Sequence, residues 1–462
     1  MSMSISISGS MSITGGGRGK AQAITAVVFP QIGTIVAGET IASALSANYD
    51  QASNYRSLGR DPGVGIQPFT PVITVNGVVV IDPFKNLMSM LGDGAAQLIA
   101  HPLEYGSMFQ DRAGTTPVTE SGQLVGLVLD HGFTGSAPVP GPELVTNGTF
   151  DSADGWVLGD GWTISGGKLR SAEPNNITAA NINGSYTAGK TYEIRYEISD
   201  YSGGLVRAEL QGGGVDSGPS RSSNGVKVER ILTTANRSAF RFIALGGTGF
   251  TGTIDNISVR ELPGYHATAV SDAARGIFRE VDGKRWIEYN GVNTAYQTPA
   301  LPAPGVDKAQ VFAGVRKLSD TADAVLVELS PDCNLNNGAL GLFAPFGVAP
   351  AFGFRSRGSL TSTANQQQGF ASPTTNILAG LGDISGDLST LRIDGTQVTQ
   401  STADQGTGNY LNYPIYIGAR AGTSLFFNGH HYATLGPIVR FGTNATAGQI
   451  DAAEAYYTAR AV

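Results

Sequence analysis

Histidine, cysteine and carboxylate side chains, which carry most protein chemistry, are sparse in this 462-residue chain. The five histidines are His101, His131, His266, His430 and His431, and none has a partner at a metal-ligand spacing such as His-Glu-x-x-His. His430 and His431 are neighbours, so on a strand their rings point to opposite faces and do not easily share one ion. We therefore expect all five to be structural.

Hydrolysis of glycosidic bonds needs two carboxylates that flank the bond to be cut. No predicted strand between 284 and 430 carries two alternating acidic residues, and Glu328 stands alone in Val-Leu-Val-Glu-Leu-Ser. A Gly-x-Ser-x-Gly nucleophile motif is also absent from the sequence. We therefore expect a protein that is not an enzyme and needs no catalytic cofactor.

A row of charged residues predicts a surface that could bind saccharides. Apolar and charged residues alternate in 191–199, 205–211 and 239–244, which predicts strands with one apolar face each. We expect one polar sheet face formed by Glu193, Arg195, Glu197, Arg207, Glu209 and Arg241. Such a face can hydrogen-bond sugar hydroxyls, with Arg195, Arg207 and Arg241 as the donors. The simpler alternative, which the pattern favours, is a solvated face without a ligand.

Aromatic side chains in the same region are candidates for stacking on sugar rings. They are Trp162 and Tyr201, both near predicted loops, and Trp156 lies in a neighbouring strand. Each tryptophan begins a strand-like pattern, so a position in the hydrophobic core is the favoured alternative for both.

Composition favours a large β protein. Charged residues make up 15% of the chain and there are 63 glycines, which fits strands joined by many turns better than long helices. The length corresponds to about three domains at roughly 150 residues each. The net charge is −7 and no basic tract occurs, which argues against nucleic acid as a partner.

Cys333 is the only cysteine, so an intrachain disulfide is excluded and a buried free thiol is expected. This composition suits folding in a reducing cytoplasm. The sequence shows no secretory signal pattern and no apolar run of about 18 residues, so we expect no membrane insertion.

The N-terminal residues predict an arm followed by a small β-domain. Serine alternates with Met1, Met3, Ile5 and Ile7, a strand-like pattern too short to fold alone; a strand added to a sheet and a disordered tail are equal alternatives. Further strands are predicted at Ile24–Phe29 and Ile32–Val36, and Ile73–Val80 carries a central Asn-Gly typical of a hairpin. Apolar spacing in Phe84–Leu103 predicts one or two short helices.

The middle of the chain predicts an insertion. Leu124–Leu129 is a short apolar strand without a partner nearby, and its natural continuation lies at Tyr265–Gly291. Glu143–Leu262 lies between them and looks self-contained. After it, strands are predicted at 284–289, 309–315, 324–329, 340–343, 351–354, 391–393 and 415–417, with a turn at Asp394-Gly395. Thr446 and Gln449 have the spacing of a capping box, which predicts a final helix at 449–459.

Several phrases in the sequence resemble those of virion proteins of tailed phages. They are Phe-Gln-Asp-x-Ala-Gly-Thr-Thr-Pro-Val at 109–118, Gly-Gln-Leu-Val-Gly-Leu-Val-Leu-Asp at 122–130, Glu-Leu-Val-Thr-Asn-Gly-Thr-Phe at 143–150 and Ile-Asp-Asn-Ile-Ser-Val-Arg-Glu-Leu-Pro-Gly at 254–264. The resemblance covers about residues 105–462. It implies a carbohydrate-binding-module-like jelly roll placed ahead of a laminin-G/concanavalin-like sandwich.

The expected fold is mainly β, with a small N-terminal β-domain, two β-sandwich (jelly-roll) domains, the first inserted into the second, and a short C-terminal helix. The expected division is an arm at 1–20, an anchoring β-domain with a helical linker at 21–104, the first part of the C-terminal sandwich at 105–140, the inserted jelly roll at 141–263 and the rest of the sandwich at 264–462.

The resemblance also implies a structural calcium that ties the two ends of the inserted jelly roll. Its candidate ligands here are Glu143, Asp151 and Asp255, because calcium takes carboxylate and carbonyl oxygens. Thr149 stands where such modules carry an acidic residue in the opening phrase, which departs from the pattern.

From the resemblance we expect a structural virion protein, made in the host cytoplasm and exposed on the particle as a fibre, spike or decoration. Its N-terminal part would bind other virion proteins of the tail or capsid, and its sandwiches would bind host surface polysaccharide. The alternative is a capsid or tail decoration that binds no glycan. A homo-oligomer held through residues 1–104 is expected because the Met/Ile arm cannot bury its apolar side alone, and the resemblance favours a trimer.

Overall fold

The computed structural model describes residues 82–173, 178–245, 249–347, 350–360 and 365–461, with side chains except at 173 and 178, and the backbone of five strands before residue 82. Those five are β1 (Met3–Gly9), β2 (Val27–Val28), β3 (Ile32–Ile35), β4 (Val72–Val75) and β5 (Val78–Val80). They form one antiparallel sheet in which β1 pairs with β2, β3 and β4. Val75 pairs with Val78, so the strands of the predicted Asn-Gly hairpin are confirmed. The rest of the predicted arm, 10–20, lies outside the described residues.

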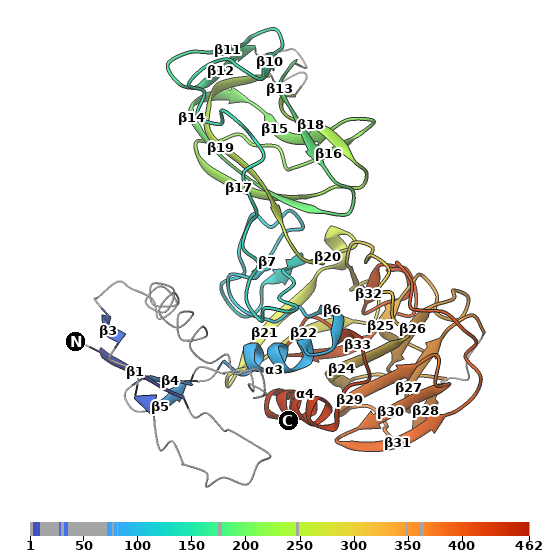
Figure 1. Ribbon diagram of the computed structural model, residues 1–462. Helices are drawn as coiled ribbons and strands as arrows, with labels where there is room; N and C mark the ends of the chain where they lie inside the picture. The colour runs from blue at the N-terminus through green and yellow to red at the C-terminus, as the bar shows by residue number, and fades with distance from the viewer. Residues whose placement is uncertain are drawn as a thin grey trace, which may run out of the picture. The chain divides into compact units, whose positions relative to one another are not determined.

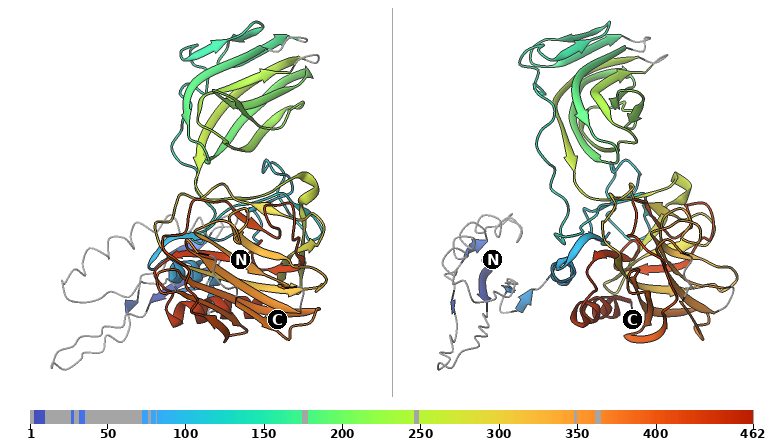
Figure 2. Two further views of the ribbon diagram at one scale, coloured as in Figure 1. Left: turned by 90° about the vertical axis from the view of Figure 1, so that its right-hand side faces the viewer. Right: turned by 45° about the vertical axis from the view of Figure 1, so that its right-hand side comes forward.

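The chain divides into two compact units, Met1–Asn86 and Leu87–Val462. Within the second unit, the strands of the module (residues 141–263) form two antiparallel sheets of five strands each. One has the order β10 (Trp156–Leu158), β13 (Thr178–Tyr186), β18 (Arg237–Ala244), β15 (Val206–Gln211) and β16 (Val215–Ser217). The other has the order β11 (Trp162–Ile164), β12 (Leu169–Glu173), β19 (Phe250–Leu262), β14 (Thr191–Gly204) and β17 (Gly225–Leu232). Figure 2 shows the two sheets of this green part of the chain facing each other.

Strict alternation along the strands builds the core of the module. Tyr192, Ile194, Tyr196 and Ile198 point inward, as the sequence predicts, and meet Phe240 and its neighbours from the opposite sheet. Burying such side chains stabilises a fold by about 1.5–3 kcal/mol each. The two sheets thus share one apolar layer, and their other faces stay polar.

The C-terminal sandwich is the remainder of the second unit. One sheet has the order β28 (Asn365–Gln368), β27 (Ala351–Arg357), β26 (Ala339–Phe343), β25 (Val325–Leu329), β32 (Ile415–Ile417), β23 (Tyr296–Gln297), β20 (Ala267–Ala269), β9 (Leu127–Val128) and β7 (Met108–Phe109). The other has the order β31 (Thr396–Ser401), β30 (Leu388–Ile393), β29 (Thr374–Asp383), β24 (Lys308–Lys317), β33 (Asn428–Tyr432), β22 (Lys284–Asn290), β21 (Gly276–Val281) and β8 (Leu124–Val125), with β34 (Ile438–Gly442) paired to β24 and to β6 (Ala95–Ile99). A 3-10 turn, η2, covers Asp272–Ala274.

The predicted strand Leu124–Leu129 serves both sheets of this sandwich. It divides at Gly126 into β8, which pairs with β21, and β9, which pairs with β20. A side chain at Gly126 would collide with the backbone of Asp111 at 2.5 Å, so the crossing point requires glycine. The predicted partners from 265–291 are thereby confirmed.

Two helices accompany the sandwich. α4 (Ala447–Ala461) begins with the predicted capping box: Gln449 N–H donates to Thr446 Oγ1 at 3.3 Å, and Thr446 N–H donates to Gln449 Oε1 at 2.9 Å. Figures 1 and 2 show α4 against the C-terminal sandwich, where it contacts β24 and β29. The fold class predicted from the sequence, mainly β with a C-terminal helix, is confirmed.

The helical prediction for 84–103 is wrong in its second half. α3 (Pro83–Gly92) is the only helix there, and Ala95–Ile99 is the strand β6, paired with β34. Gly94, with φ of +68°, prevents the helix from continuing, and the apolar residues that follow pair with the free edge of β34. None of the described helices has the length and apolar character needed to span a bilayer.

Candidate functional site

The outward face of the sheet β10-β13-β18-β15-β16, called the arginine face below, brings two predicted binding residues together. The backbone register places Asn181, Arg241, Glu209 and Ser217 side by side on four neighbouring strands. Arg207 precedes Glu209 by two residues on β15 and therefore points to the same face. This face is opposite to the apolar layer.

Glu209 holds both arginines. Arg207 Nε donates to Glu209 Oε1 at 2.8 Å, and Arg241 Nε donates to Glu209 Oε2 at 2.7 Å. The Glu209 side chain is 1% exposed, whereas those of Arg207 and Arg241 are 32% and 21% exposed. Ser217 Oγ donates to Glu209 Oε1 at 3.1 Å. The buried carboxylate is thus saturated with donors, while each arginine side chain stays partly exposed.

Amide and apolar groups complete the arginine face. Gln211 Nε2 donates to Asn181 Oδ1 at 2.7 Å, which fixes both amides beside the arginines. Ala239 and Ile243 flank Arg241 on β18 and are 7% exposed. The resulting surface presents fixed hydrogen-bond donors and acceptors, which can bind sugar hydroxyl groups.

Arg195 lies on the other sheet, so the prediction of a single polar face is wrong. Glu193, Arg195 and Glu197 are on β14, which belongs to the sheet opposite β15 and β18. Arg195 is exposed, while Glu193 pairs with Arg230 at 2.7 Å. The sequence pattern correctly gives which residues of a strand point outward, but it cannot show which sheet a strand joins.

Neither aromatic candidate lies on the arginine face. Trp162 is 4% exposed and stacks on Phe250 with ring centroids 6.2 Å apart. Trp156 is also buried, so both tryptophans belong to the core, the alternative that the pattern favours. Tyr201 packs half-buried against Phe250 and donates its hydroxyl to Gly204 O at 3.0 Å. A stacking platform formed by Trp162 is therefore excluded in this conformation.

The three calcium candidates do not gather. Within the described ranges, no three His, Cys, Asp or Glu side chains are placed to hold a metal ion. Glu143 accepts from Ser258 Oγ at 2.6 Å and from Val259 N–H at 2.7 Å, and it pairs with Arg260. Hydrogen bonds of the protein therefore tie the two ends of the module at this point. Asp151 instead accepts from Thr149 Oγ1 at 2.8 Å, and Asp255 from the adjacent Asn256 N–H at 2.7 Å. The positions of these three residues therefore do not support a shared calcium ion.

Two histidines, His266 and His101, lie around Asp130, where the chain leaves and re-enters the C-terminal sandwich. Asp130 accepts from the N–H groups of Ala100 and Tyr265, and its own N–H donates to His266 Nδ1 at 3.0 Å. His101 Nε2 contacts Tyr265 O at 2.7 Å. Burial lowers the pKa of His266 to about 3 and also lowers the pKa of His101. These rings are therefore neutral structural groups at neutral pH.

The remaining chemical residues are also held within the fold. His431 is buried between Tyr289 and Phe427, and burial lowers its pKa to about 3, whereas His430 faces the other way and stacks on Trp286 at 5.5 Å. Glu328 is fully buried and accepts from Arg420, and burial raises its pKa.

Cys333 is a buried free thiol whose pKa is raised by burial, so it is a poor nucleophile. Its neighbour in the core, Glu328, accepts the Cys333 N–H at 2.7 Å. The expected buried thiol is confirmed.

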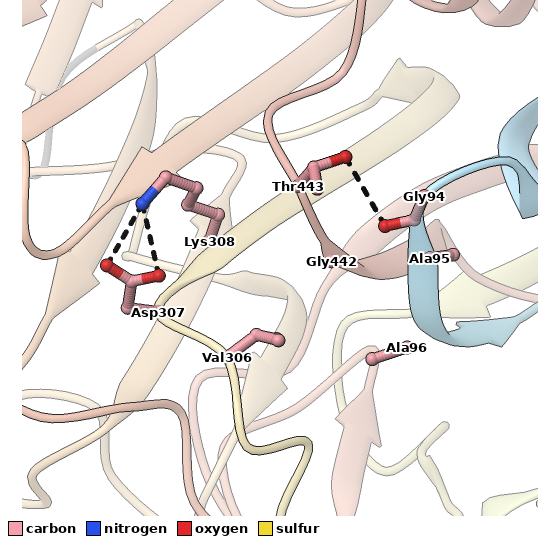
Figure 3. A pocket seen from close by; sticks show the side chains of 8 residues that line it. All are labelled: Gly94, Ala95, Ala96, Val306, Asp307, Lys308, Gly442 and Thr443. Carbon is pink, nitrogen blue, oxygen red and sulfur yellow. Dashed lines mark hydrogen bonds and ion pairs between the residues drawn. The ribbon is translucent and has the colours of Figure 1, made fainter.

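An open hollow of about 490 Å³ lies in the C-terminal sandwich, where β6 meets the start of β24. Figure 3 shows Lys308 paired with Asp307 on one side and Thr443 bonded to Gly94 on the other. Lys308 also pairs with Asp383 at 3.1 Å. The positive charge of Lys308 is thus compensated by two carboxylates. The other residues that line the hollow are mainly glycine and alanine. We therefore assign this hollow no ligand.

No family model matches this chain, and no curated protein matches its sequence. Among solved structures, the receptor-binding domain of botulinum neurotoxin D is similar over 42% of this chain and 50% of that domain, with 10% identity and a TM-score of 0.29. A truncated AlyQ with CBM32 and alginate lyase domains is similar over 59% of this chain and 91% of that one, with 8% identity and a TM-score of 0.25. The full extracellular region of zebrafish Gpr126/Adgrg6 is similar over 60% of this chain and 35% of that one, with 13% identity and a TM-score of 0.22.

The match to the neurotoxin domain spans half of its length, and all three TM-scores are low. We rest no functional argument on these likenesses. The function proposed below depends on the residues of the arginine face and on the sequence phrases.

Sequence reasoning missed Asn181 as a member of the arginine face. The alternation in 205–211 places Gln211 on the outward side with Arg207 and Glu209, but Gln211 is not among the predicted binding residues. Asn181 and Asn183 alternate with the inward Ile182, which is a recognisable outward polar pattern in β13. What the sequence does not contain is the pairing of β13 with β18, which joins strands about 60 residues apart.

Proposed function

We propose that this protein is a structural surface protein of a tailed-phage virion, a fibre, spike or decoration, whose module binds host surface saccharides through the arginine face. The virion assignment is supported by the phrases at 109–130, 143–150 and 254–264. The binding assignment is supported by one observation: a fully buried Glu209 that holds two partly exposed arginines on an outward sheet face. No catalytic role, metal or cofactor is part of this proposal.

Glu209 orders the two arginine side chains before a ligand binds, and a freely solvated face lacks this order. Two long side chains on an open surface lose conformational entropy when they bind a ligand, roughly 2 kcal/mol for each arginine. Here the carboxylate and the neighbouring strands already restrict both guanidinium groups. A saccharide that accepts hydrogen bonds from them therefore meets donors that are largely ordered before binding.

The expected affinity of one site is low. The arginine face offers no aromatic platform, so a single site should bind at roughly millimolar strength, about 4 kcal/mol. Several copies on one particle multiply this through effective concentration, on the order of a hundredfold or more. We propose that residues 1–104 attach the protein to other virion proteins and hold a homo-oligomer, with a trimer favoured.

Binding to a glycan array and to bacterial cells tests the proposal with the full-length protein. Arg207→Ala should lower the binding of the multivalent protein and lower its stability by only about 1 kcal/mol, because Glu209 keeps Arg241 and Ser217 as partners. Arg195→Ala is the matched control, since Arg195 is an exposed arginine on the opposite sheet. If no saccharide and no cell is bound, the alternative of a purely structural decoration protein replaces this one.

Light scattering tests the proposed oligomer. The full-length protein should be multimeric at micromolar concentration. A variant without residues 1–86, the first compact unit, should form oligomers with fewer chains. A monomeric full-length protein would contradict the assignment of oligomer contacts to this part of the chain.

A further inference from the structure

We infer that the arginine face selects an acidic saccharide, one that carries a carboxylate on a uronic-acid or sialic-acid type of unit. This inference rests on the proposed function, because it names the ligand class of the same site. It follows from the excess of positive charge on the face and from the pairing of the single Glu209 carboxylate with both arginines.

The arginine face carries one more positive than negative side chain. Along its described strands, the charged residues that alternate with the core positions are Arg207, Glu209 and Arg241, together with the buried Arg237 at the start of β18, whose charge is compensated by Asp216. Asp216, on the neighbouring strand β16, is paired with Arg237 at 2.7 Å and lies in register with the core residue Leu210. One buried carboxylate therefore serves two guanidinium groups, and one positive charge remains without a partner on this face.

This surplus is local. The whole chain carries a net charge of −7, so a positive outward face is not a by-product of a basic protein. The side chains of Arg207 and Arg241 are 32% and 21% exposed, so solvent reaches both of them on the outward side of the sheet. A second carboxylate, supplied by a ligand, can approach them from there.

A carboxylate is the group that arginine recognises best. The planar guanidinium presents parallel N–H donors that match the two carboxylate oxygens, and charge-assisted hydrogen bonds are about twice as strong as neutral ones. A neutral sugar would accept hydrogen bonds but leave the surplus charge uncompensated. The flanking amides of Asn181 and Gln211 then remain for hydroxyl groups of the same or the next sugar unit.

The test compares acidic saccharides with matched neutral ones on the full-length protein. Sialyllactose is paired with lactose, and oligogalacturonate with its carboxyl-reduced counterpart. Surface-immobilised saccharides keep the multivalent gain. We expect the acidic member of each pair to bind at least tenfold more tightly, and raising NaCl from 50 to 500 mM to weaken it severalfold, because screening acts on exposed charges.

Charge-removing variants locate the effect. Arg207→Gln and Arg241→Gln should each reduce the preference for the acidic member towards equality, while Arg195→Gln, on the opposite sheet, should leave it intact. The melting temperature of each variant, measured alongside, separates loss of binding from loss of folding; if one of the two face variants is destabilised, the other carries the test.

Each remaining outcome has a defined meaning. Equal binding of both members of a pair, unaffected by Arg207→Gln, overturns the acidic class but leaves saccharide binding in place. If Arg195→Gln reduces the preference for the acidic saccharide as much as Arg207→Gln does, the attraction between protein and saccharide is non-specific, and the acidic class is overturned as well. If sulfated saccharides bind and carboxylated ones do not, the face selects another anion, and the assignment of a carboxylate is overturned. If no saccharide binds, the proposed function itself fails.

Discussion

The backbone N–H of Arg230, on β17 of the module, donates to the carbonyl oxygen of Ala113, in the loop after β7, at 2.8 Å. The Arg230 guanidinium also bonds Gly114 O and lies 4.3 Å from the centroid of the Phe109 ring. A strand of the module is therefore bonded directly to the Phe109–Val118 phrase. This contact gives the phrase a physical role, which is to hold the module where its chain enters and leaves.

Asp111 shapes that loop, and its removal should loosen the contact. Its carboxylate accepts from Ala113 N–H at 3.0 Å, Thr115 N–H at 3.1 Å and Thr116 N–H at 2.7 Å, and these bonds lower its pKa against the opposing effect of burial. Asp111→Ala leaves these donors without their acceptor. We expect a loss of about 2 kcal/mol and faster amide exchange at Arg230, measured by hydrogen exchange.

Asp151→Ala is the control for Asp111→Ala. Asp151 is exposed, and its carboxylate accepts from Thr149 Oγ1 alone among the bonds described. Its replacement should change neither the stability nor the exchange of Arg230. Unchanged exchange at Arg230 in Asp111→Ala would show that the loop holds its shape without the carboxylate.

The module should be removable. Gly141 N–H donates to Glu261 O at 2.8 Å, so the entering and leaving segments run side by side, which is the geometry that tolerates insertions. Replacing residues 141–263 with a short Gly/Ser join should leave a soluble protein whose C-terminal sandwich melts cooperatively. Calorimetry of this variant and of the isolated module provides the measurement. Aggregation of the first together with an unfolded second would contradict independent folding.

Acid should destabilise the sandwich through two buried histidines. His266 and His431 both have folded-state pKa values lowered to about 3, below the ordinary 6.5, so the unfolded chain binds their protons first. Their contribution is therefore complete above pH 6.5 and is lost progressively as the pH falls from 6.5 towards 3. At pH 5 each histidine should lower the free energy of unfolding by about 2 kcal/mol.

His431→Phe separates this effect from the titration of carboxylates. The ring of His431 packs edge-on against Tyr289 and Phe427, so a phenyl ring suits the site without binding a proton. The melting temperature of the variant should fall less than that of the parent between pH 7 and pH 5. An identical acid dependence would show that His431 does not titrate on unfolding in this range.

The elements that the sequence predicts correctly are those fixed by local chemistry. The turn at Asp394-Gly395 has φ of +49° and +79°, which follows from its Asp-Gly pair, and the capping box of α4 follows from Thr446 and Gln449. Period-2 alternation likewise gives the inward residues of β14. Each of these depends on residues within a few positions of one another.

The elements that the sequence does not predict depend on distant contacts. Arg440 is fully buried and donates through Nε to Leu91 O at 2.7 Å and through Nη2 to Asp93 O at 2.6 Å, which ends α3 where periodicity alone would continue it. Those partners are about 350 residues apart in the chain. The arginine face has the same origin, because strand pairing decides that Arg207 and Arg241 meet and that Arg195 does not.

Replacement of Glu209 should affect stability far more than replacement of either arginine. In Glu209→Gln, two adjacent guanidinium groups lose their common counter-charge and repel each other, and removing one partner of a buried ion pair typically costs about 3–5 kcal/mol. In Arg207→Ala, Glu209 keeps Arg241 at 2.7 Å and Ser217 at 3.1 Å, so the loss should stay near 1 kcal/mol. The double variant Glu209→Gln/Arg207→Gln should recover part of the stability, because the repulsion is gone. Hydrogen exchange at the amides of β15 and β18 measures the three effects within the full-length protein. If Glu209→Gln is no more destabilising than Arg207→Ala, the carboxylate does not organise the arginine face, and the ordering of donors on which the binding proposal depends is lost with it.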